Sequence, residues 1–173
     1  MAGVVTRLFT DSDLPADLRA LHAAWDRECF TTPNPYRWAR PQWHIFVLAD
    51  GAPVSYVGLF SRQCTLDGQP LHLGGLGSVM TPIAHRRRGY AGIGVREANH
   101  ALRTVVGAPF ALLVTRPSLI PFYARFGWHT IDDPVIVQRP DGTPTRYTET
   151  VMVQPLGPDP WPGGTLDLCG LPW

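Results

Sequence analysis

The apolar positions in the first half of the chain come in short runs separated by turn residues, a pattern typical of strands. Asp50-Gly51 lies between two such runs and predicts a hairpin, and Asp67-Gly68 repeats the same turn signal. One helix is expected over residues 14–29, after the capping signal Asp11-Ser12-Asp13. The expected strands are residues 4–9, 44–49, 53–63 and 71–81. Residues 31–41, rich in proline and aromatic side chains, are expected to form a loop or a broken helix.

The second half combines helical spacing with further apolar runs. A helix ending near residue 105 is predicted because its apolar residues recur on one face. These residues are Tyr90, Ile93, Ala98, Ala101, Leu102 and Val105. The continuous apolar run 110–115 predicts a buried strand, and Ser118 is expected to cap a short helix over 120–126 that Gly127 ends. Two more strands, 135–138 and 148–154, precede a tail rich in proline and glycine.

The element order β-α-β-β-β-α-β-α-β-β predicts one mixed α/β domain over residues 1–173, without internal repeats. At 173 residues and 45% hydrophobic, the chain can bury a sizeable core. A formal charge of +1 gives no electrostatic reason to expect nucleic acid or a membrane surface as partner.

The sequence gives no indication of export or of a metal site. No stretch has the pattern of a signal peptide or a membrane span. Cys29, Cys64 and Cys169 are widely spaced, which is typical of reduced thiols in a cytoplasmic protein. The histidines are too scattered to predict a metal site. Six tryptophans leave enough apolar surface for a homodimer.

The segment His85-Arg86-Arg87-Arg88-Gly89-Tyr90-Ala91-Gly92 carries the clearest chemistry. Its arginines lie where the second helix begins, and a helix N-terminus already carries about +0.5 charge. An anion bound between the arginines and the free N–H groups of the first turn explains this arrangement. Gly89 and Ala91 let the backbone approach a large ligand. Phosphate or pyrophosphate is the expected ligand, and a solvated basic turn is the alternative.

Two motifs resemble those of the GCN5-related N-acetyltransferases (GNAT). Arg86 to Ala91 matches the family pattern of Gln or Arg, two residues, Gly, one residue, then Gly or Ala. Tyr123 to Trp128 is similar to the family's Tyr-x-x-x-Gly-Phe/Trp helix. The resemblance implies an α/β (α+β) GNAT fold. Its central sheet is mixed, mostly antiparallel, splayed at the acetyl-CoA site and flanked by helices. It also implies acetyl-CoA as cosubstrate.

The resemblance implies roles for individual residues. Backbone groups of Val79 and Thr81 are expected to pair with the pantetheine arm, and the Val79 N–H to polarise the thioester carbonyl. Tyr123 takes the place of the general acid that protonates the leaving thiolate. Ordinary strand and core residues are the alternative interpretation of all three. The expected cofactor-binding residues are Val79, Thr81, Arg86, Arg87, Arg88, Gly89, Tyr90, Ala91 and Gly92.

The chain is also distantly similar to the aminoglycoside 2′-N-acetyltransferases, through the Tyr123 helix and the Cys-containing tail 167–173. In that group the tail folds back, and its terminal carboxylate helps to hold the cationic sugar. The strand glutamate of those relatives, which deprotonates the amine through water, is replaced here by Gly77, beside Ser78. Their aspartate-rich stretch is replaced by residues 146–149. The loss of acidic groups favours a less cationic acceptor, of the kasugamycin kind.

The expected reaction is direct transfer, in a ternary complex, to a primary amine of a small molecule. The first candidate is the 2′-amino group of an aminoglycoside, a reaction that confers antibiotic resistance. Water on backbone carbonyls or a carboxylate near Glu149 is the expected base. The candidate substrate-binding residues are Asp26, Glu28, Trp38, Gly77, Ser78, Glu149 and Trp173, with Asp132 and Asp133 as further carboxylates. Each carboxylate has a solvated surface charge as its alternative.

Two other functions fit the same motifs. One is a GNAT enzyme that acetylates a protein N-terminus, a peptide or a polyamine, which needs a wide, shallow groove. The other is a catalytically silent acyl-CoA-binding sensor, which has no need of Tyr123.

Overall fold

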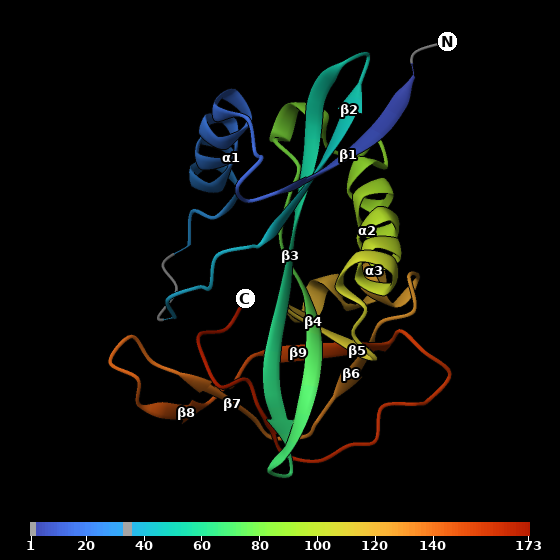
Figure 1. Cartoon of the computed structure of the whole chain (residues 1–173). Helices are drawn as coiled ribbons and strands as arrows, with labels where there is room; N and C mark the ends of the chain where they lie inside the picture. The colour runs from blue at the N-terminus through green and yellow to red at the C-terminus, as the bar shows by residue number, and fades with distance from the viewer. Residues whose placement is uncertain (1–2, 33–35) are drawn as a thin grey trace.

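Ten strands form one curled, mixed sheet in this computed structural model, which describes residues 3–32 and 36–173 (Figure 1). The main path runs β6-β9-β5-β4-β3-β10-β7-β8, and β2 and then β1 continue from β3. The strands are β1 (Val4–Thr10), β2 (Trp43–Ala49), β3 (Ala52–Leu66), β4 (Gln69–Met80), β5 (Phe110–Thr115), β6 (His129–Ile131), β7 (Val135–Gln138), β8 (Pro144–Arg146), β9 (Thr150–Pro155) and β10 (Leu166–Asp167). Among the described residues, β4 with β5 and β10 with β7 are the parallel pairs, so the sheet is mostly antiparallel, as expected.

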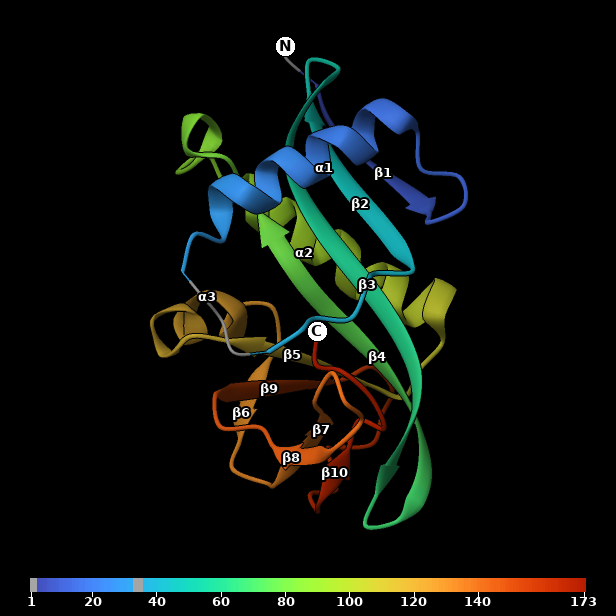
Figure 2. The ribbon, with the colours of Figure 1, turned by 90° about the vertical axis from the view of Figure 1, so that its left-hand side faces the viewer.

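Helices cover both faces of the sheet (Figures 1 and 2). The helical segments are α1 (Ala16–Cys29), η1 (Ile83–His85), α2 (Tyr90–Ala101), η2 (Leu102–Val106), η3 (Pro117–Leu119) and α3 (Ile120–Ala124). On one face α1 packs through Trp25 onto Phe46, Tyr56 and Met80. On the other face α2 and α3 share a second core with β3, β4 and β5.

The part of the sheet that lies lowest in Figure 1 curls over itself and encloses a third core. Leu166 in β10 pairs with Leu66 of β3 on one side and with Val135 of β7 on the other. This short strand joins the β7–β8 hairpin to the long β3–β4 hairpin. The enclosed core includes Phe60 and Trp173. The proline- and glycine-rich tail therefore contributes a strand and a buried tryptophan, which its composition did not predict.

Both helix-capping predictions are wrong. No side chain of residues 3–32 and 36–173 caps α1. Pro15 precedes the helix, while Asp13 accepts a hydrogen bond from the Thr10 hydroxyl at 2.5 Å. Ser118 lies inside the 3₁₀ turn η3, and no side chain caps α3. Side chains that were predicted to cap helices form hydrogen bonds within turns or ion pairs instead.

The predicted apolar face of the second helix holds only in part. Its apolar residues from Ala98 to Leu102 are buried, but Val105 is 48% exposed. The helix continues through η2 as a π-turn, which changes the angular spacing of its side chains. Asn99 is buried instead, and it accepts a hydrogen bond from the Trp128 indole at 3.1 Å.

Most tryptophans are core residues and do not form an apolar surface. Trp25, Trp128 and Trp173 are buried, and Trp38 is the one exposed tryptophan of the described residues. The homodimer therefore remains a prediction, and the described tryptophans do not form the apolar surface on which it was based. No helix in residues 3–32 and 36–173 is long and apolar enough to cross a membrane. The same residues contain no cluster of side chains suited to hold a metal ion.

Candidate functional site

The sheet opens between β4 and β5. The two strands pair only through Leu73–Phe110, Gly74–Ala111 and Gly75–Leu112. Beyond Gly75, β4 stays paired with β3, while β5 stays paired with β9 as far as Thr115. The two strands therefore diverge, and within the described residues the edge of β4 that faces β5 has no strand partner after Gly75. An extended ligand chain can use these backbone groups.

A β-bulge lies within the open part of β4. The register skips there, so that Ser78 and Val79 together oppose Val57 of β3. Ser78 has a φ of 51°, in the left-handed region that is uncommon for a residue with a side chain. Bulges re-aim backbone groups and are frequent next to active sites. Val79, predicted as the oxyanion donor, lies in this bulge, half-buried against the core that contains Tyr123.

The arginine turn forms a cavity of about 420 Å³ at the start of α2. Gly89 precedes the helix with a φ of 81°, a conformation that favours glycine. No side chain of the described residues caps α2, so the N–H groups of its first turn are open to a ligand. The lining residues are Thr81, His85, Arg86, Arg87, Gly89, Tyr90, Ala91, Gly92, Phe122 and Arg125. Open amides beside several cations suit the pyrophosphate of a nucleotide cofactor.

The expected cofactor residues have different positions around this cavity. Arg87 lines it, whereas the exposed Arg88 does not. Arg86 lines it and also donates from Nε to the Thr81 carbonyl at 2.9 Å. The Thr81 hydroxyl is hydrogen-bonded to Ser55 at 2.8 Å. Thr81 therefore fixes the end of β4 to the arginine turn in addition to lining the cavity.

Sequence reasoning did not assign Phe122 and Arg125 to this cavity, and it named His85 only as the first residue of the basic segment. His85 comes from η1, and Phe122 and Arg125 from the segment around α3. The Arg125 guanidinium lies 5.4 Å from the centre of the Phe122 ring, which holds it beside α3. Arg125 falls inside the Tyr123 motif, two residues after the tyrosine, so its nearness to the arginine turn follows once α3 packs beside α2.

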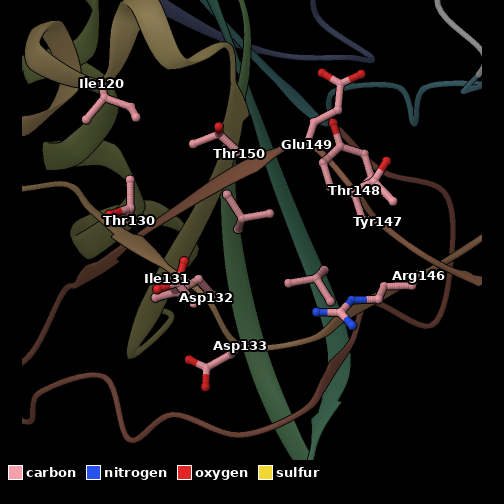
Figure 3. Close-up of a pocket in the computed structure, with 12 residues that line it drawn as sticks. Ile120, Thr130, Ile131, Asp132, Asp133, Arg146, Tyr147, Thr148, Glu149 and Thr150 are labelled. Carbon is pink, nitrogen blue, oxygen red and sulfur yellow. The ribbon is translucent and has the colours of Figure 1, made fainter.

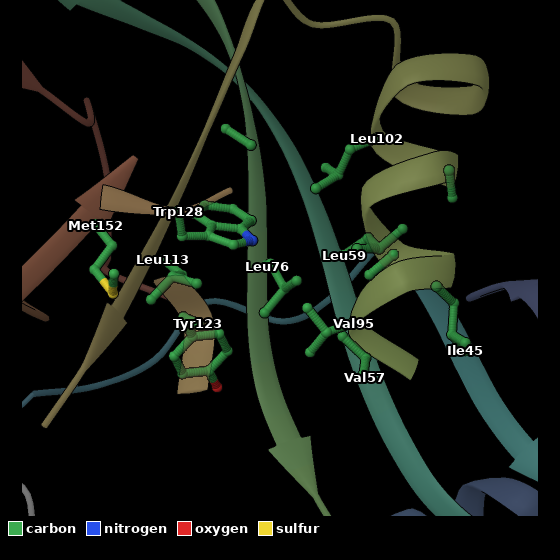
Figure 4. Close-up of a cluster of buried hydrophobic side chains, with 13 residues drawn as sticks. Ile45, Val57, Leu59, Leu76, Val95, Leu102, Leu113, Tyr123, Trp128 and Met152 are labelled. Carbon is green, nitrogen blue, oxygen red and sulfur yellow. The ribbon is translucent and has the colours of Figure 1, made fainter. Parts of the chain in front are cut away.

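Tyr123 projects from α3 into the core beside the opening (Figure 4). Its neighbours in that core include Leu76 of β4 and Leu113 of β5, one on each diverging strand. Burial raises the pKa of Tyr123 to about 12, so the hydroxyl is protonated at neutral pH. Among the described residues the hydroxyl has no hydrogen-bond partner. A protonated, unpaired hydroxyl on a largely buried ring is suited to donate a proton to a leaving group.

Three segments that are far apart in the sequence meet beside the opening, on the face of β4 that points away from α2. The Ala39 N–H donates to the Pro172 carbonyl at 2.7 Å, which joins the 36–42 segment to the tail. The Tyr36 ring lies 4.7 Å from that of Tyr147, and its hydroxyl lies 3.3 Å from the Thr148 hydroxyl. The expected aromatic loop therefore forms a wall with the tail and the 147–149 turn, although residues 33–35 lie outside the described part. Trp38 is exposed beside Tyr36.

Gly77 lies against the tail segment of this wall. A Cβ at Gly77 would be 3.1 Å from the Phe60 ring and 3.3 Å from the main-chain carbonyl carbon of Trp173. Gly77 pairs with Gly58, where a Cβ would be 2.7 Å from the Pro41 side chain. The tail thus folds back to Gly77. The Trp173 indole is buried, and it donates to the Leu112 carbonyl at 3.0 Å.

A larger cavity of about 680 Å³ adjoins the 147–149 turn (Figure 3). Ile120, the first residue of the Tyr123 helix, lines it together with Glu149 and Asp132. Asp133 also lines it, but its carboxylate accepts hydrogen bonds from the Trp161 indole and the Gly164 N–H, both at 3.1 Å. Asp132 and Glu149 are therefore the exposed carboxylates of this cavity that are open to a cationic group.

The structure does not bring the two candidate carboxylates of α1, Asp26 and Glu28, to these cavities. Glu28 accepts a hydrogen bond from the Ile83 N–H at 2.9 Å, so it ties the end of α1 to η1. Asp26 is exposed on α1 near His22. Neither residue lines the cavity beside Glu149 or the one at the arginine turn.

The chain was compared with protein families and solved structures. The model of the acetyltransferase (GNAT) domain matches residues 6–131. A GNAT family acetyltransferase from Brucella melitensis, solved with acetyl-CoA, is 17% identical, with a TM-score of 0.60 over 94% of each chain. The Escherichia coli GNAT family N-acetyltransferase YhbS, solved with CoA, is 16% identical, with a TM-score of 0.66 over 97% of this chain and 91% of that one.

A third structure supports the same fold. Escherichia coli ElaA is 15% identical, with a TM-score of 0.61 over 88% of this chain and 99% of its own. A comparison with curated proteins finds no match. The domain match covers most of the chain, including the arginine turn, the diverging strands and Tyr123. The chain therefore belongs to the GNAT acetyltransferases, which use acetyl-CoA as their acetyl donor.

Proposed function

We propose that the chain transfers the acetyl group of acetyl-CoA to a primary amine of a small molecule, by direct attack in a ternary complex. The observation that carries this proposal is the wall over Gly77, where the 36–42 segment, the 147–149 turn and the tail are joined by hydrogen bonds and ring contacts. A walled site suits a compact acceptor. A protein N-terminus or a peptide needs an open groove.

The proposed mechanism assigns a role to each group of residues around the opening between β4 and β5. Acetyl-CoA supplies the acyl group as a thioester. The arginine turn and the first turn of α2 bind its pyrophosphate, and the open edge of β4 at Val79 and Thr81 pairs with its pantetheine arm. The Val79 N–H in the bulge stabilises the oxyanion, and Tyr123 protonates the departing sulfur.

The aminoglycoside acceptor is the finer part of the proposal. The first candidate is the 2′-amino group of a weakly cationic aminoglycoside of the kasugamycin kind. Support comes from the tail, which lies against Gly77 as the resemblance implies, and from Trp38 and Glu149 beside the wall. With Asp133 committed to the 161–164 segment, Asp132 and Glu149 remain for cationic groups. So few carboxylates suit an acceptor with few ammonium groups.

The first experiment measures acetyl-CoA-dependent thiol release with a panel of amines: kasugamycin, 2′-amino aminoglycosides, polyamines and peptides. Turnover confined to aminoglycosides, with intersecting initial-velocity lines, supports both the acceptor and direct transfer. Turnover with peptides or polyamines alone contradicts the acceptor. Parallel lines contradict direct transfer.

Tyr123→Phe tests the assigned acid in the same assay. A loss of about 10²–10⁴-fold in kcat is expected, because the thiolate then leaves without its proton donor. The affinity for CoA, measured by calorimetry, should stay at the wild-type value. Wild-type protein that binds CoA but acetylates no amine is the result expected of an acyl-CoA sensor.

A further inference from the structure

A hydrogen-bonded chain of a carboxylate, an imidazole and a phenol crosses the face of the sheet that α1 covers. The Asp11 carboxylate lies 3.2 Å from His44 Nε2, and His44 Nδ1 lies 2.7 Å from the Tyr56 hydroxyl. His44 and Tyr56 are buried, whereas Asp11 is exposed. The chain therefore connects the solvent to a point inside the protein. Because its members come from three separate segments, sequence spacing did not reveal it.

The inner end of this chain lies at the glycine pair of the acceptor side. A Cβ at Gly58 would be 3.2 Å from the Tyr56 hydroxyl. Gly58 is the antiparallel partner of Gly77, and paired residues point to the same face, with their Cβ positions about 4.5–5.5 Å apart. Tyr56 thus lies one strand away from the position at which the aminoglycoside-acetylating relatives carry their glutamate.

The protonation states of the chain follow from its partners. An ionised carboxylate only accepts hydrogen bonds, so His44 Nε2 carries the hydrogen and Nδ1 accepts from the Tyr56 hydroxyl. Burial lowers the pKa of His44, and the imidazole is neutral at pH 7. The hydrogen bond from Arg19 lowers the pKa of Asp11, which keeps it ionised. The other titratable groups facing this chain are His22 and Asp26 on α1.

We propose that Tyr56, held by His44 and Asp11, takes the proton released by the acceptor amine and passes it to solvent. The inference rests on the proposed function, and it names the base that Gly77 cannot supply. His44 and Asp11 are positioning residues: they act through Tyr56.

The proton moves in one concerted step. Before the nitrogen bonds to the acetyl carbon, the bound ammonium group of the acceptor gives a proton to the Tyr56 oxygen, directly or through one water, and becomes the neutral amine that attacks. The phenolic proton goes at the same time to His44 Nδ1. Burial raises the pKa of Tyr56, so a free phenolate does not form and the two transfers have to be coupled. The resulting imidazolium is stabilised by Asp11 and loses its Nε2 proton to solvent beside that exposed carboxylate. The second N–H proton of the acceptor goes to water after the attack. Proton exchange with water then returns the hydrogen from Nδ1 to Nε2 before the next turnover.

The test compares Tyr56→Phe and His44→Gln with His72→Gln. His72 is a matched control, because its Nε2 lies 2.8 Å from the Ser61 hydroxyl in a separate imidazole–hydroxyl pair of the β3–β4 hairpin. Two acceptors are used: the best alkyl amine of the panel, and hydroxylamine, whose nitrogen is largely unprotonated at neutral pH. Nitrogen-15 NMR of the histidine rings reports the His44 tautomer without any turnover.

With the alkyl amine, kcat/KM should fall about 100-fold in Tyr56→Phe and His44→Gln, and remain unchanged in His72→Gln. With hydroxylamine the loss should be much smaller, because that nitrogen needs no base to become nucleophilic. The acidic limb of the pH profile should move to higher pH in Tyr56→Phe, toward the pKa of the amine itself. The His44 spectrum should show hydrogen on Nε2 and a shifted Nδ1 signal in Tyr56→Phe.

A purely structural role predicts different results. Equal losses with both acceptors, an unmoved pH profile, or a Tyr56→Phe variant as active as the wild type would overturn the inference while leaving the proposed function intact. Wild-type protein that acetylates no amine would overturn the proposed function, and this inference with it.

Discussion

The Trp173 indole occupies the space that a side chain at residue 75 would need. A Cβ at Gly75 would lie 2.3 Å from the Trp173 Nε1, closer than any packed carbon can stand. The indole stacks on Phe60 with ring centres 5.5 Å apart, and its N–H donates to the carbonyl of Leu112 on β5, the strand partner of Gly75. The tail thus packs where β4 and β5 begin to diverge.

This contact explains why β4 is rich in glycine. Gly75 and Gly77 leave room for Trp173 and Phe60 on one face, and Gly74 leaves room for Leu102 on the other, where a Cβ would be 2.9 Å from its side chain. Arg62 holds the tail in place by donating to the Leu171 carbonyl at 2.7 Å, and its guanidinium lies 4.8 Å from the centre of the Trp173 ring. The glycines therefore allow the tail to approach the strand beside the acceptor site.

Gly75→Ala should destabilise the protein through this contact. The new methyl group displaces the indole or Phe60, and overpacking of this kind costs about 1–3 kcal/mol of unfolding free energy. Urea denaturation measures the loss. Gly157→Ala is the control, because a Cβ there meets nothing within 4 Å. Equal stability of the two variants would show that the tail does not hold the position described.

Local motifs were predictable from the sequence because their signals lie within a few residues. Arg86 to Gly92 and the Tyr123 helix combine their chemistry with an adjacent turn or helix, so their positions followed from the pattern. The β3 and β4 strands followed from their apolar runs and Asp-Gly turns. The divergence of β4 and β5 came from the family resemblance, and the pairing confirms it.

Contacts between distant segments were not predictable in the same way. β10 has two residues and β6 and β8 have three each, too few to show a period. The burial of Trp173 depends on a tail that folds back across β3, and no local pattern encodes that path. Asp11, His44 and Tyr56 gave no signal for the same reason: each is an ordinary residue of its own segment.

Arg87→Ala and Arg125→Ala should weaken CoA binding. Both side chains line the cavity at the arginine turn, and losing one charge-assisted hydrogen bond to phosphate costs about 1.5–3 kcal/mol, or roughly 10- to 100-fold in Kd. Calorimetry with CoA measures the change, and pantetheine, which has no phosphate, should show none. Arg88→Ala should have a smaller effect, since Arg88 does not line the cavity.

The exposed arginine of β1 provides a charge-matched control for these variants. Arg7→Ala removes the same charge from a residue that does not line the cavity at the arginine turn, and it should leave the CoA affinity unchanged. A uniform loss of affinity in Arg7, Arg87 and Arg125 variants would indicate a general electrostatic effect and contradict a specific phosphate site.

The pH dependence of turnover should reflect the buried environment of Tyr123. The general acid has to be protonated, and burial raises its pKa to about 12, so the acid form persists above the ordinary tyrosine value of 10.0. The kcat profile of the wild type should therefore show no alkaline decline from this group up to about pH 10. Rates measured from pH 7 to 10, with Tyr123→Phe for comparison, test this. An alkaline limb with a pKa below 10 that disappears in Tyr123→Phe contradicts the assignment.

Folding stability should fall as the pH is lowered through the histidine range. Burial lowers the pKa values of His22 and His44 below 6.5, so at pH 5–6 the unfolded chain binds protons that the folded protein does not. Stability then decreases with falling pH, by at most about 1.4 kcal/mol per pH unit for each histidine. Urea unfolding at pH 5, 6, 7 and 8 measures the slope. His44→Gln should reduce it. A slope that His44→Gln leaves unchanged would mean that His44 takes up its proton as readily in the folded protein as in the unfolded chain, which its burial opposes.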